Sequence, residues 1–222
     1  MSSPVQKSPA GDPGAPREVM PVSVLTESEL GSEAQRERRK RILDATLAIA
    51  SKGGYEAVQM RDVATRADVA MGTVYRYFTS KDHLLAATLV FWVEQLQDHL
   101  RQQPALGETP AARVLEVLDR ALRAMNRQPT LVAAVFLSLS SPDPEAVRCQ
   151  MKIAELMDAI VFEAIGTPAP IDTPVRSRMI GHIWYSSLVG WVNGWSSVDH
   201  VHNELRIAAE LLLPNGLEME TH

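Results

Sequence analysis

The stretch from Gln59 to Lys81, QMRDVATRADVAMGTVYRYFTSK, constrains the fold of this chain more than any other. Its first part places apolar residues at helical spacing, at Met60, Val63, Ala64 and Ala67. Asp68 follows at a turn position that needs a positive φ, which Asp tolerates because its short side chain can bond the local backbone. A second short helix then carries Val69, Val74 and Phe78 on its inward side. The stretch therefore predicts a helix-turn-helix.

The outward face of the second helix combines hydroxyls, a guanidinium, an ammonium and a glycine, at Gly72, Thr73, Tyr75, Arg76, Tyr77 and Lys81. Such a face can enter the major groove of DNA and hold the flanking phosphates. The formal net charge is −5, but Ser32–His83 carries ten Lys and Arg against seven Asp and Glu, whereas Leu84–His222 carries ten against sixteen. The positive excess thus lies on the segment that carries the motif, as attraction to phosphates requires.

The ordered set GYEAVQMRDVATRADVAMGTVYRYFTSKDHLL resembles the DNA-binding domain of the TetR family of regulators. The resemblance rests on the glycine–tyrosine entry, the R-D-V-A helix, the G-T-V-Y-R-Y-F recognition helix and the S-K-D-x-L-L exit. The N-terminal half, from SELGSEAQRERRKRILDATLAIASKGG onward, is similar to the KstR-type repressors of steroid catabolism in actinobacteria. Val58 and Ala70 depart from the family pattern, because Ser or Thr caps worth about 1 kcal/mol each often stand there.

The resemblance implies that Arg61 and Thr73 meet bases or nearby phosphates, and that Tyr75, Tyr77 and Lys81 contact phosphates. The basic run ahead of the motif adds Arg36, Arg39 and Lys40 as candidates for phosphate or minor-groove contacts; the alternative is a solvated helix face. The implied partner is a palindromic double-stranded operator bound by a homodimer.

Apolar periodicity and cap residues predict an all-α chain of about nine helices, with no strand-like alternation of useful length. We expect a tail without packed structure over 1–31, a DNA-binding domain over 32–78, a ligand-binding and dimerisation domain over 79–216, and a short tail over 217–222. A long connector helix should begin at a capping box of Thr79 with Asp82, and the last helix at a capping box of Ser196 with Asp199. Ser32 should cap the first helix, which Gly53 and Gly54 should end, and Asp143 before Pro144 should cap another.

The body is rich in Met and aromatic residues and carries no visible catalytic set, which predicts an adaptable apolar pocket. Taken one at a time, each of these residues fits a core position better than a pocket; taken together they favour a pocket. The candidate lining is Trp92, Leu96, Leu118, Leu122, Met125, Phe136, Met157, Val161, Trp184 and Leu188. The resemblance implies a hydrophobic effector, a steroid or an acyl-CoA-like molecule, that releases the protein from DNA.

The resemblance also implies dimerisation through the last two long helices. Small side chains at Ser187, Gly190 and Gly194 let another helix approach closely, which would justify the cost of glycine inside a helix. The predicted interface is Ser187, Gly190, Trp191, Gly194, Val201, Leu205, Ala208 and Leu212.

Enzyme classes find little support, because the sequence lacks G-x-G-x-x-G, P-loop, H-E-x-x-H and G-x-S-x-G patterns and its six histidines show no metal-ligand spacing. We therefore expect no catalytic residue, metal or cofactor. The single cysteine, Cys149, fits a buried thiol in a reducing compartment, and no apolar run suits a membrane span, so we expect a cytoplasmic protein. Two alternatives stay open: a TetR-type repressor of an efflux pump that senses hydrophobic drugs, and an all-helical protein-interaction module.

Overall fold

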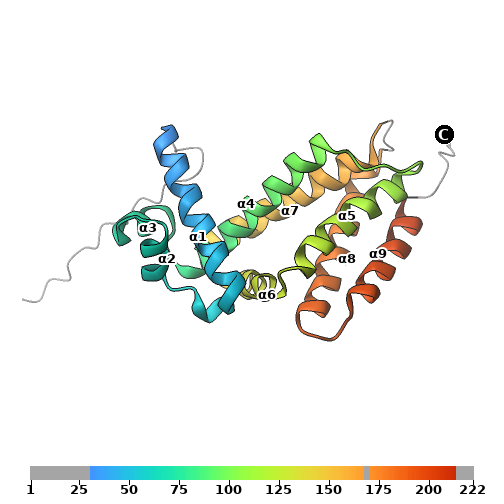
Figure 1. Ribbon diagram of the computed structural model, residues 1–222. Coiled ribbons are helices and arrows are strands. Elements are labelled where there is room, and N and C mark those ends of the chain that lie inside the picture. Colours follow the sequence, from blue (N-terminus) through green and yellow to red (C-terminus); the bar gives the residue numbers. More distant parts are fainter. Residues whose placement is uncertain (1–30, 168–170, 214–222) are drawn as a thin grey trace, which may run out of the picture.

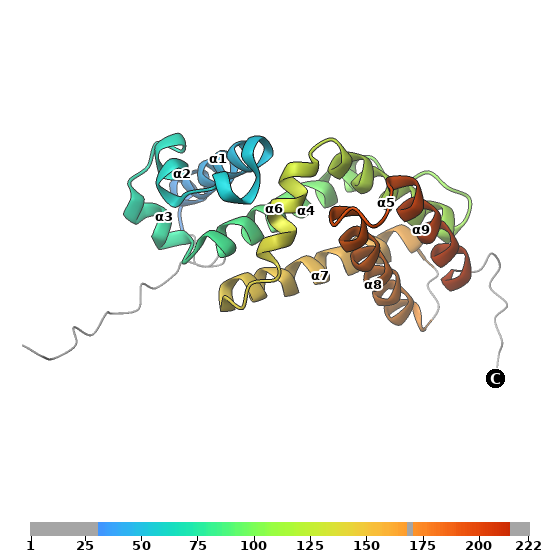
Figure 2. The ribbon, with the colours of Figure 1, turned by 90° about the horizontal axis from the view of Figure 1, so that it is seen from below.

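The computed structural model describes residues 31–167 and 171–213, and within these ranges the chain forms nine helices and no strand (Figures 1 and 2). The predicted all-α fold is confirmed. The helices are α1 (Glu33–Ala57), α2 (Met60–Arg66), α3 (Met71–Tyr77), α4 (Lys81–Gln102), α5 (Pro110–Asn126), α6 (Pro129–Ser138), α7 (Pro144–Ile165), α8 (Thr173–Val192) and α9 (Val198–Leu212). The tails predicted for 1–31 and 217–222 lie outside the described residues, apart from Gly31.

Helices α1 to α3 form a head at one end of the molecule (Figure 1). Ser32 begins α1 with a capping box: its hydroxyl accepts from the Gln35 amide, and the Gln35 side chain accepts from the Ser32 amide. Gly54 kinks the helix at a φ of 66°, and helical turns resume to Ala57, although the sequence predicted that the helix stops at the two glycines. Asp68 has the predicted positive φ, 53°, between α2 and α3.

Helix α4 leaves the head and runs beside α7, while α6 packs against both α1 and α4 (Figures 1 and 2). The N-cap of α4 is Ser80 rather than the predicted Thr79, since the Ser80 hydroxyl accepts from the His83 amide at 3.0 Å. Asp143 caps α7 as its position before Pro144 predicted, and its carboxylate accepts from the Glu145 amide at 2.8 Å. The connector therefore begins one residue later than expected, directly after the recognition helix and its exit loop.

Helices α8 and α9 pack against each other, and α9 also packs against α5 (Figure 1). The N-cap of α9 is Ser197, one residue beyond the predicted Ser196. Gly194 has a φ of 76° after the end of α8, and the amides of Trp195 and Ser196 donate to the Gly190 carbonyl at 2.8 and 3.2 Å. Gly194 thus serves the turn between the two helices, because residues with a side chain rarely adopt such a φ.

In the part of the chain that the structure describes, no helix combines the length and the apolar character needed to cross a bilayer.

Candidate nucleic-acid interface and ligand cavity

The recognition helix α3 presents most of the residues expected to face DNA. Gly72, Tyr75 and Arg76 are exposed, Thr73 is half-buried, and Val74 is fully buried against the head. Arg61 is exposed on the neighbouring helix α2. One side of α3 therefore fixes it in the head, while the other side carries a hydroxyl, a phenol and a guanidinium free to meet a groove.

Tyr77 does not belong to that exposed face. Only 3% of its surface is accessible, and its hydroxyl donates to the Gln35 carbonyl of α1 at 3.5 Å. The expectation that Tyr77 faces outward is wrong. In a seven-residue helix, the positions three apart at Val74 and Tyr77 fall on the same buried side. Tyr77 packs α3 onto α1 and leaves the exposed set as Gly72, Thr73, Tyr75 and Arg76.

Lys81 lies at the start of α4, and its position depends on Tyr55. The Lys81 ammonium lies 3.7 Å from the centroid of the Tyr55 ring, a cation–π contact. The Tyr55 hydroxyl donates to Asp82 Oδ1 at 2.6 Å, and this hydrogen bond to a carboxylate raises the pKa of Tyr55 to about 12. The kink at Gly54 precedes Tyr55, so the glycine–tyrosine pair recognised in the sequence places an aromatic ring under a cation beside the recognition helix.

The three candidates on α1 differ in their surroundings. Arg36 is exposed, whereas the Arg39 guanidinium lies over the Phe78 ring at 5.7 Å from its centroid. Lys40 forms an exposed ion pair with Asp44 at 2.8 Å, which holds its pKa above the usual value. Arg41, which was not among the candidates, donates to the Ala67 carbonyl at the end of α2 and so holds α1 and α2 together.

A cavity of about 220 Å³ lies within the body, walled by α4, α5, α6, α7 and α8. Seven of the ten residues expected to line a pocket do line it: Trp92, Leu96, Met125, Phe136, Met157, Trp184 and Leu188. The other three, Leu118, Leu122 and Val161, are at most 2% exposed and are absent from the wall, so they are core residues. Periodicity identifies the buried side of a helix, but it does not separate the part that faces a cavity from the part that faces a neighbouring helix.

The cavity wall is chemically divided. Helices α4, α5 and α6 contribute only apolar side chains, at Leu89, Trp92, Val93, Leu96, Ala121, Met125, Phe136 and Leu139. Helices α7 and α8 add four polar ones, Gln150, Asp158, Arg178 and His182. Arg178 and His182 are exposed, and Tyr185 beside them stacks on Phe136 at 5.9 Å between ring centroids. The polar side of the cavity is therefore also its rim.

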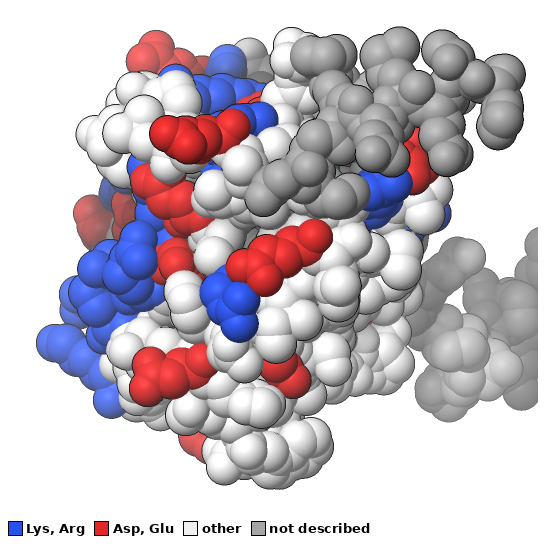
Figure 3. All heavy atoms as spheres, turned by 90° about the vertical axis from the view of Figure 1, so that its right-hand side faces the viewer, with Lys and Arg blue, Asp and Glu red and all other residues white. Residues whose placement is uncertain are grey.

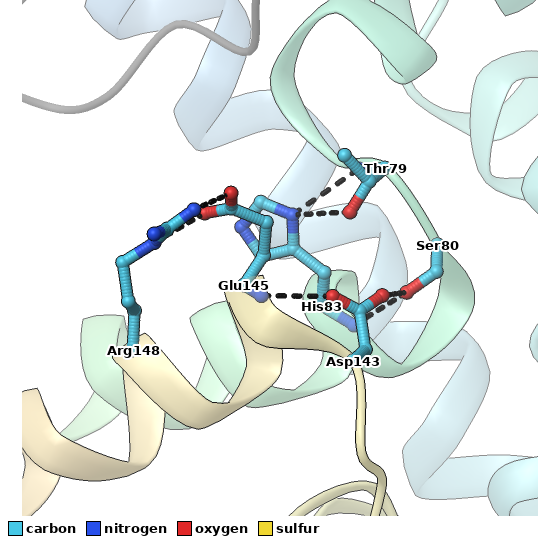
Figure 4. Close-up of polar contacts among 6 residues, drawn as sticks. All are labelled: Thr79, Ser80, His83, Asp143, Glu145 and Arg148. Atoms are coloured by element: carbon cyan, nitrogen blue, oxygen red, sulfur yellow. Dashed lines mark hydrogen bonds and ion pairs between the residues drawn. The ribbon is translucent and has the colours of Figure 1, made fainter.

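A polar junction links the start of α4 to the start of α7 (Figure 4). The hydroxyl of Ser80, the N-cap of α4, donates to the carboxylate of Asp143, the N-cap of α7. The Thr79 amide donates to His83 Nδ1 at 3.1 Å, which requires that nitrogen to be unprotonated. Glu145 and Arg148 form an ion pair beside them on α7. Hydrogen bonding of Asp143 to Ser80 and to the α7 amides outweighs its burial and lowers its pKa.

His83 is the buried member of this junction. It is 7% exposed and lies edge-on to Phe78 at 5.3 Å between ring centroids. Burial lowers its pKa, against the opposing charges of Glu145 and Asp143. Cys149 lies on α7, one turn beyond Glu145, and burial raises the pKa of its thiol to about 11. A thiol held protonated fits the predicted structural role rather than a reactive one.

Most of the residues expected in a dimer interface face the interior of a single chain. Ser187, Gly190, Val201, Leu205 and Ala208 are all buried. The Ser187 hydroxyl donates to Glu204 of α9 at 2.7 Å, and a Cβ at Gly190 would lie 3.1 Å from Ser196 Oγ. The small side chains therefore permit close packing of α8 on α9 within one chain. Trp191 and Leu212 are half-buried, and Gly194 is exposed in the turn.

The apolar residues that α8, α9 and their connecting turn leave exposed are different ones. Apart from Tyr185 at the cavity rim, they are Val175 at 54%, Met179 at 46%, Trp195 at 78%, Ile207 at 42% and Leu211 at 76% exposure. Ile207 and Leu211 are four residues apart on α9 and so share one side of it. Seen from the end opposite the head, acidic and basic side chains are scattered over a surface with broad uncharged areas (Figure 3). Periodicity again identified helix faces without showing which neighbour each face meets.

Among the described residues, no group of His, Cys, Asp and Glu is arranged to hold a metal ion. The nearest approaches are pairs: His202 with Asp119 at 2.7 Å and His200 with Glu204 at 3.2 Å. His182 is an exposed residue of the cavity rim.

A basic head with a helix-turn-helix, joined by a connector helix to a body with an apolar cavity, is the architecture of a ligand-responsive DNA-binding regulator. Residues 42–88 match the family model "Bacterial regulatory proteins, tetR family", and residues 107–212 match "Tetracyclin repressor-like, C-terminal domain". The chain belongs to the TetR family of transcription regulators, whose members bind operator DNA, dimerise and bind small molecules.

Curated relatives extend this likeness along nearly the whole chain. The transcriptional repressor KstR of Mycobacterium tuberculosis is 43% identical over 214 residues, which cover 96% of this chain and 97% of that protein. KstR of Rhodococcus jostii is 44% identical, covering 87% and 91%. The resemblance noted in the N-terminal half therefore continues through the body, and the prediction of a DNA-binding regulator rather than an enzyme is confirmed.

Solved structures of two other proteins have a fold similar to that of this chain. A TetR regulator from Rhodococcus sp. RHA1 is 33% identical with a TM-score of 0.74, covering 82% of this chain and 99% of its own. FadR from Thermus thermophilus, solved in complex with lauroyl-CoA, is 20% identical with a TM-score of 0.59, covering 78% of this chain and 92% of its own. At that identity, the likeness to FadR establishes the fold alone.

Proposed function

We propose that this protein is a homodimeric repressor that binds a palindromic operator near lipid or steroid catabolism genes and is released by a sterol-derived ligand, which can be a CoA thioester. The observation that carries the proposal is the double role of α4. Its first turn follows the exit loop of the recognition helix, and its later turns supply Leu89, Trp92, Val93 and Leu96 to the cavity wall.

The mechanism follows from that continuity. A ligand that fills the cavity displaces α4 and thereby moves the head of each protomer. Two recognition helices must stand about 34–36 Å apart, or a multiple of that distance, to enter successive major grooves. A changed separation spoils the simultaneous fit to two half-sites, so the ligand selects a conformation with low operator affinity. The ligand and the operator then weaken each other's binding by the same factor, typically 1–3 kcal/mol of coupling, or about 5- to 150-fold.

The assignment of the effector rests on two supports. The cavity is walled on three helices by apolar side chains and opens at a rim with Arg178 and His182, which suits an elongated apolar molecule with a polar end outside. The named relatives are KstR repressors, and this favours catabolic control over the sensing of hydrophobic drugs by an efflux-pump repressor. Family membership leaves no support for the protein-interaction module.

The DNA contacts proposed are those with suitable exposure and charge. Thr73, Arg76 and Arg61 would meet base edges or nearby phosphates, while Tyr75 and Lys81 would hold phosphates. Gly72 lets the backbone approach closely, and Arg36, Arg39 and Lys40 would reach phosphates beside the groove. Dimerisation would use the exposed apolar set of Val175, Met179, Trp195, Ile207 and Leu211.

Titration of the full chain against a labelled duplex from the region flanking its own gene tests the proposal. The expected result is specific binding that a steroid-CoA thioester lowers at fixed salt, with free CoA and palmitoyl-CoA as comparison ligands. Specific binding that only palmitoyl-CoA lowers would move the effector class to fatty acyl thioesters. Failure to bind any specific duplex would overturn the repressor assignment.

A further inference from the structure

One carboxylate stands on the wall of the apolar cavity. Asp158 is a half-buried residue of α7, on the same side of the helix as the lining residues Ala154 and Met157. Burial raises the pKa of its carboxyl group, opposed by the positive charges of Arg178 and His182 on α8. Its backbone carbonyl accepts from the Ser177 hydroxyl at 3.1 Å, but within the described ranges no group is found donating to its side-chain oxygens.

The facing helix leaves room at this carboxylate. Gly181 lines the cavity from the interior of α8, and a Cβ built on it would lie 3.6 Å from Asp158 Oδ1. Gly181 has an ordinary helical φ, so the turn geometry that explains Gly194 does not apply to it. Glycine inside a helix is less favourable than alanine, because glycine loses more conformational freedom on folding. The absence of a side chain keeps the space in front of the carboxylate open to the cavity.

A carboxylate in such surroundings is stabilised when it accepts a hydrogen bond from a donor. A hydrogen bond to a charged acceptor is stronger than one between neutral groups. The walls from α4, α5 and α6 offer no donor near a bound molecule apart from the Trp92 indole. The donors on α7 and α8, at Gln150, Arg178, His182 and Tyr185, line the same cavity, but none of these described side chains is hydrogen-bonded to the carboxylate, which leaves its oxygens open to a donor from a ligand.

We propose that Asp158 is the specificity-determining residue of the cavity and accepts a hydrogen bond from a hydroxyl group of the effector, so that the preferred ligands are apolar molecules carrying an alcohol rather than wholly apolar or keto-only ones. The inference rests on the proposed function in that it assigns the effector to this cavity. Gly181 provides the space in which the alcohol lies. A ketone in the same place would bring its oxygen, a hydrogen-bond acceptor, against the carboxylate oxygens of Asp158, which are also acceptors, so no hydrogen bond would form.

Three neutral steroids test this inference, because they differ at a single ring carbon: testosterone with a hydroxyl, androstenedione with a ketone, and androst-4-en-3-one with hydrogen. Affinities are measured by calorimetry on the full chain. We expect wild type to bind testosterone about tenfold more tightly than the other two, in line with one hydrogen bond to a charged acceptor. Asp158→Leu should remove that preference by weakening testosterone alone.

Two further variants separate specificity from general damage. Glu155→Leu removes an exposed carboxylate from the same helix outside the cavity and should leave all three affinities unchanged. Ile153→Ala, in the apolar wall, should weaken the three steroids alike. Each variant must retain wild-type operator binding without steroid, which shows that it is folded.

The outcomes distinguish this inference from the proposed function. If all three steroids bind wild type equally and Asp158→Leu changes nothing, the alcohol subsite is wrong while the steroid cavity stands. If Asp158→Leu weakens all three equally, the residue only supports the fold of the cavity, and the inference is again overturned. If none of the steroids binds to wild type, the alcohol subsite fails, whereas the effector class is decided by the titration with the steroid-CoA thioester, because these free steroids lack the thioester.

Discussion

Ser80 and Asp143 cap two different helices and are hydrogen-bonded to each other across the junction of head and body (Figure 4). Ser80 accepts from the first turn of α4 while it donates to Asp143, which accepts from the first turn of α7. Helix α7 also walls the cavity, beginning with Gln150, two turns beyond its cap. The start of the connector is therefore tied to the cavity by a second helix besides α4 itself.

Replacing Ser80 by Ala should lower the free energy of unfolding by about 1–2 kcal/mol, because it removes a helix cap and leaves a carboxylate without one partner. It should also reduce the effect of ligand on operator affinity, since the start of α4 then loses its hydrogen bond to the start of α7. Thermal denaturation and operator titration with and without ligand measure the two effects. Ser140→Ala, at an exposed serine nearby, is the control, and an equal loss of coupling in both variants would contradict the role of the junction.

His83 should make the stability of the protein sensitive to acid. Its folded-state pKa is below the ordinary value of 6.5, so the unfolded chain binds more protons than the folded chain as the pH falls through that value. The stabilisation is present above about pH 6.5 and is lost progressively at lower pH. His83→Asn keeps an acceptor for the Thr79 amide but does not titrate. Denaturant unfolding across this pH range should show a weaker pH dependence for the variant, and identical curves would contradict the assignment.

Lys81 should contribute to operator affinity in a salt-dependent way. Lys81→Ala removes one proposed phosphate contact, so the slope of log affinity against log salt should fall in magnitude by about 1, with similar weakening on all sequences. Tyr55→Leu removes the ring beneath the ammonium and should weaken binding in the same direction, whereas Tyr55→Phe keeps the ring and should weaken it less. Unchanged salt slopes in Lys81→Ala would exclude the phosphate contact.

Charges on the exposed face of α9 should dissociate the dimer. The double variant Ile207→Glu with Leu211→Glu places two carboxylates on a surface that is 42% and 76% exposed in one chain, so the monomer should fold while the interface is lost. Sedimentation velocity at low micromolar concentration would show a monomer with unchanged helical content. A persistent dimer would locate the interface elsewhere. Leucine at Gly190 and Gly194, in contrast, should disrupt the turn and destabilise the chain itself.

Filling the cavity should abolish induction without loss of operator binding. Met157 is a half-buried wall residue, and Met157→Trp adds bulk where the ligand would lie. Met151→Trp introduces the same side chain on the same helix at a position that is 61% exposed and outside the wall, so it should behave as wild type. Operator titrations with ligand measure both. Normal induction in Met157→Trp would place the ligand outside this cavity. Leu122, a core residue, would be unsuitable for this purpose because a larger side chain there would overpack the interior.

The sequence by itself determined the elements and the class of protein. The spacing of apolar residues and the positions of cap and proline residues predicted the helix-turn-helix, the positive φ of Asp68, and the caps at Ser32 and Asp143. These features could be predicted because helices and turns depend on neighbours a few residues away in the chain. The position of the cavity could be predicted in outline, since most of its large apolar residues were identified from composition and period. Charge counted by region also assigned DNA binding to the head.

Only the tertiary structure decided which neighbour each side chain meets. Tyr77 and Tyr75 are both aromatic residues of a seven-residue helix, yet α1 covers the first and leaves the second exposed. Gly190 and Gly194 suggested a contact between helices, but the turn into α9 accounts for both. The bond between Ser80 and Asp143 and the place of Asp158 on the polar side of the cavity wall depend on helices far apart in sequence. Local periodicity identifies the side of a helix that is buried, but only the packing of the whole chain determines which residues contact that side.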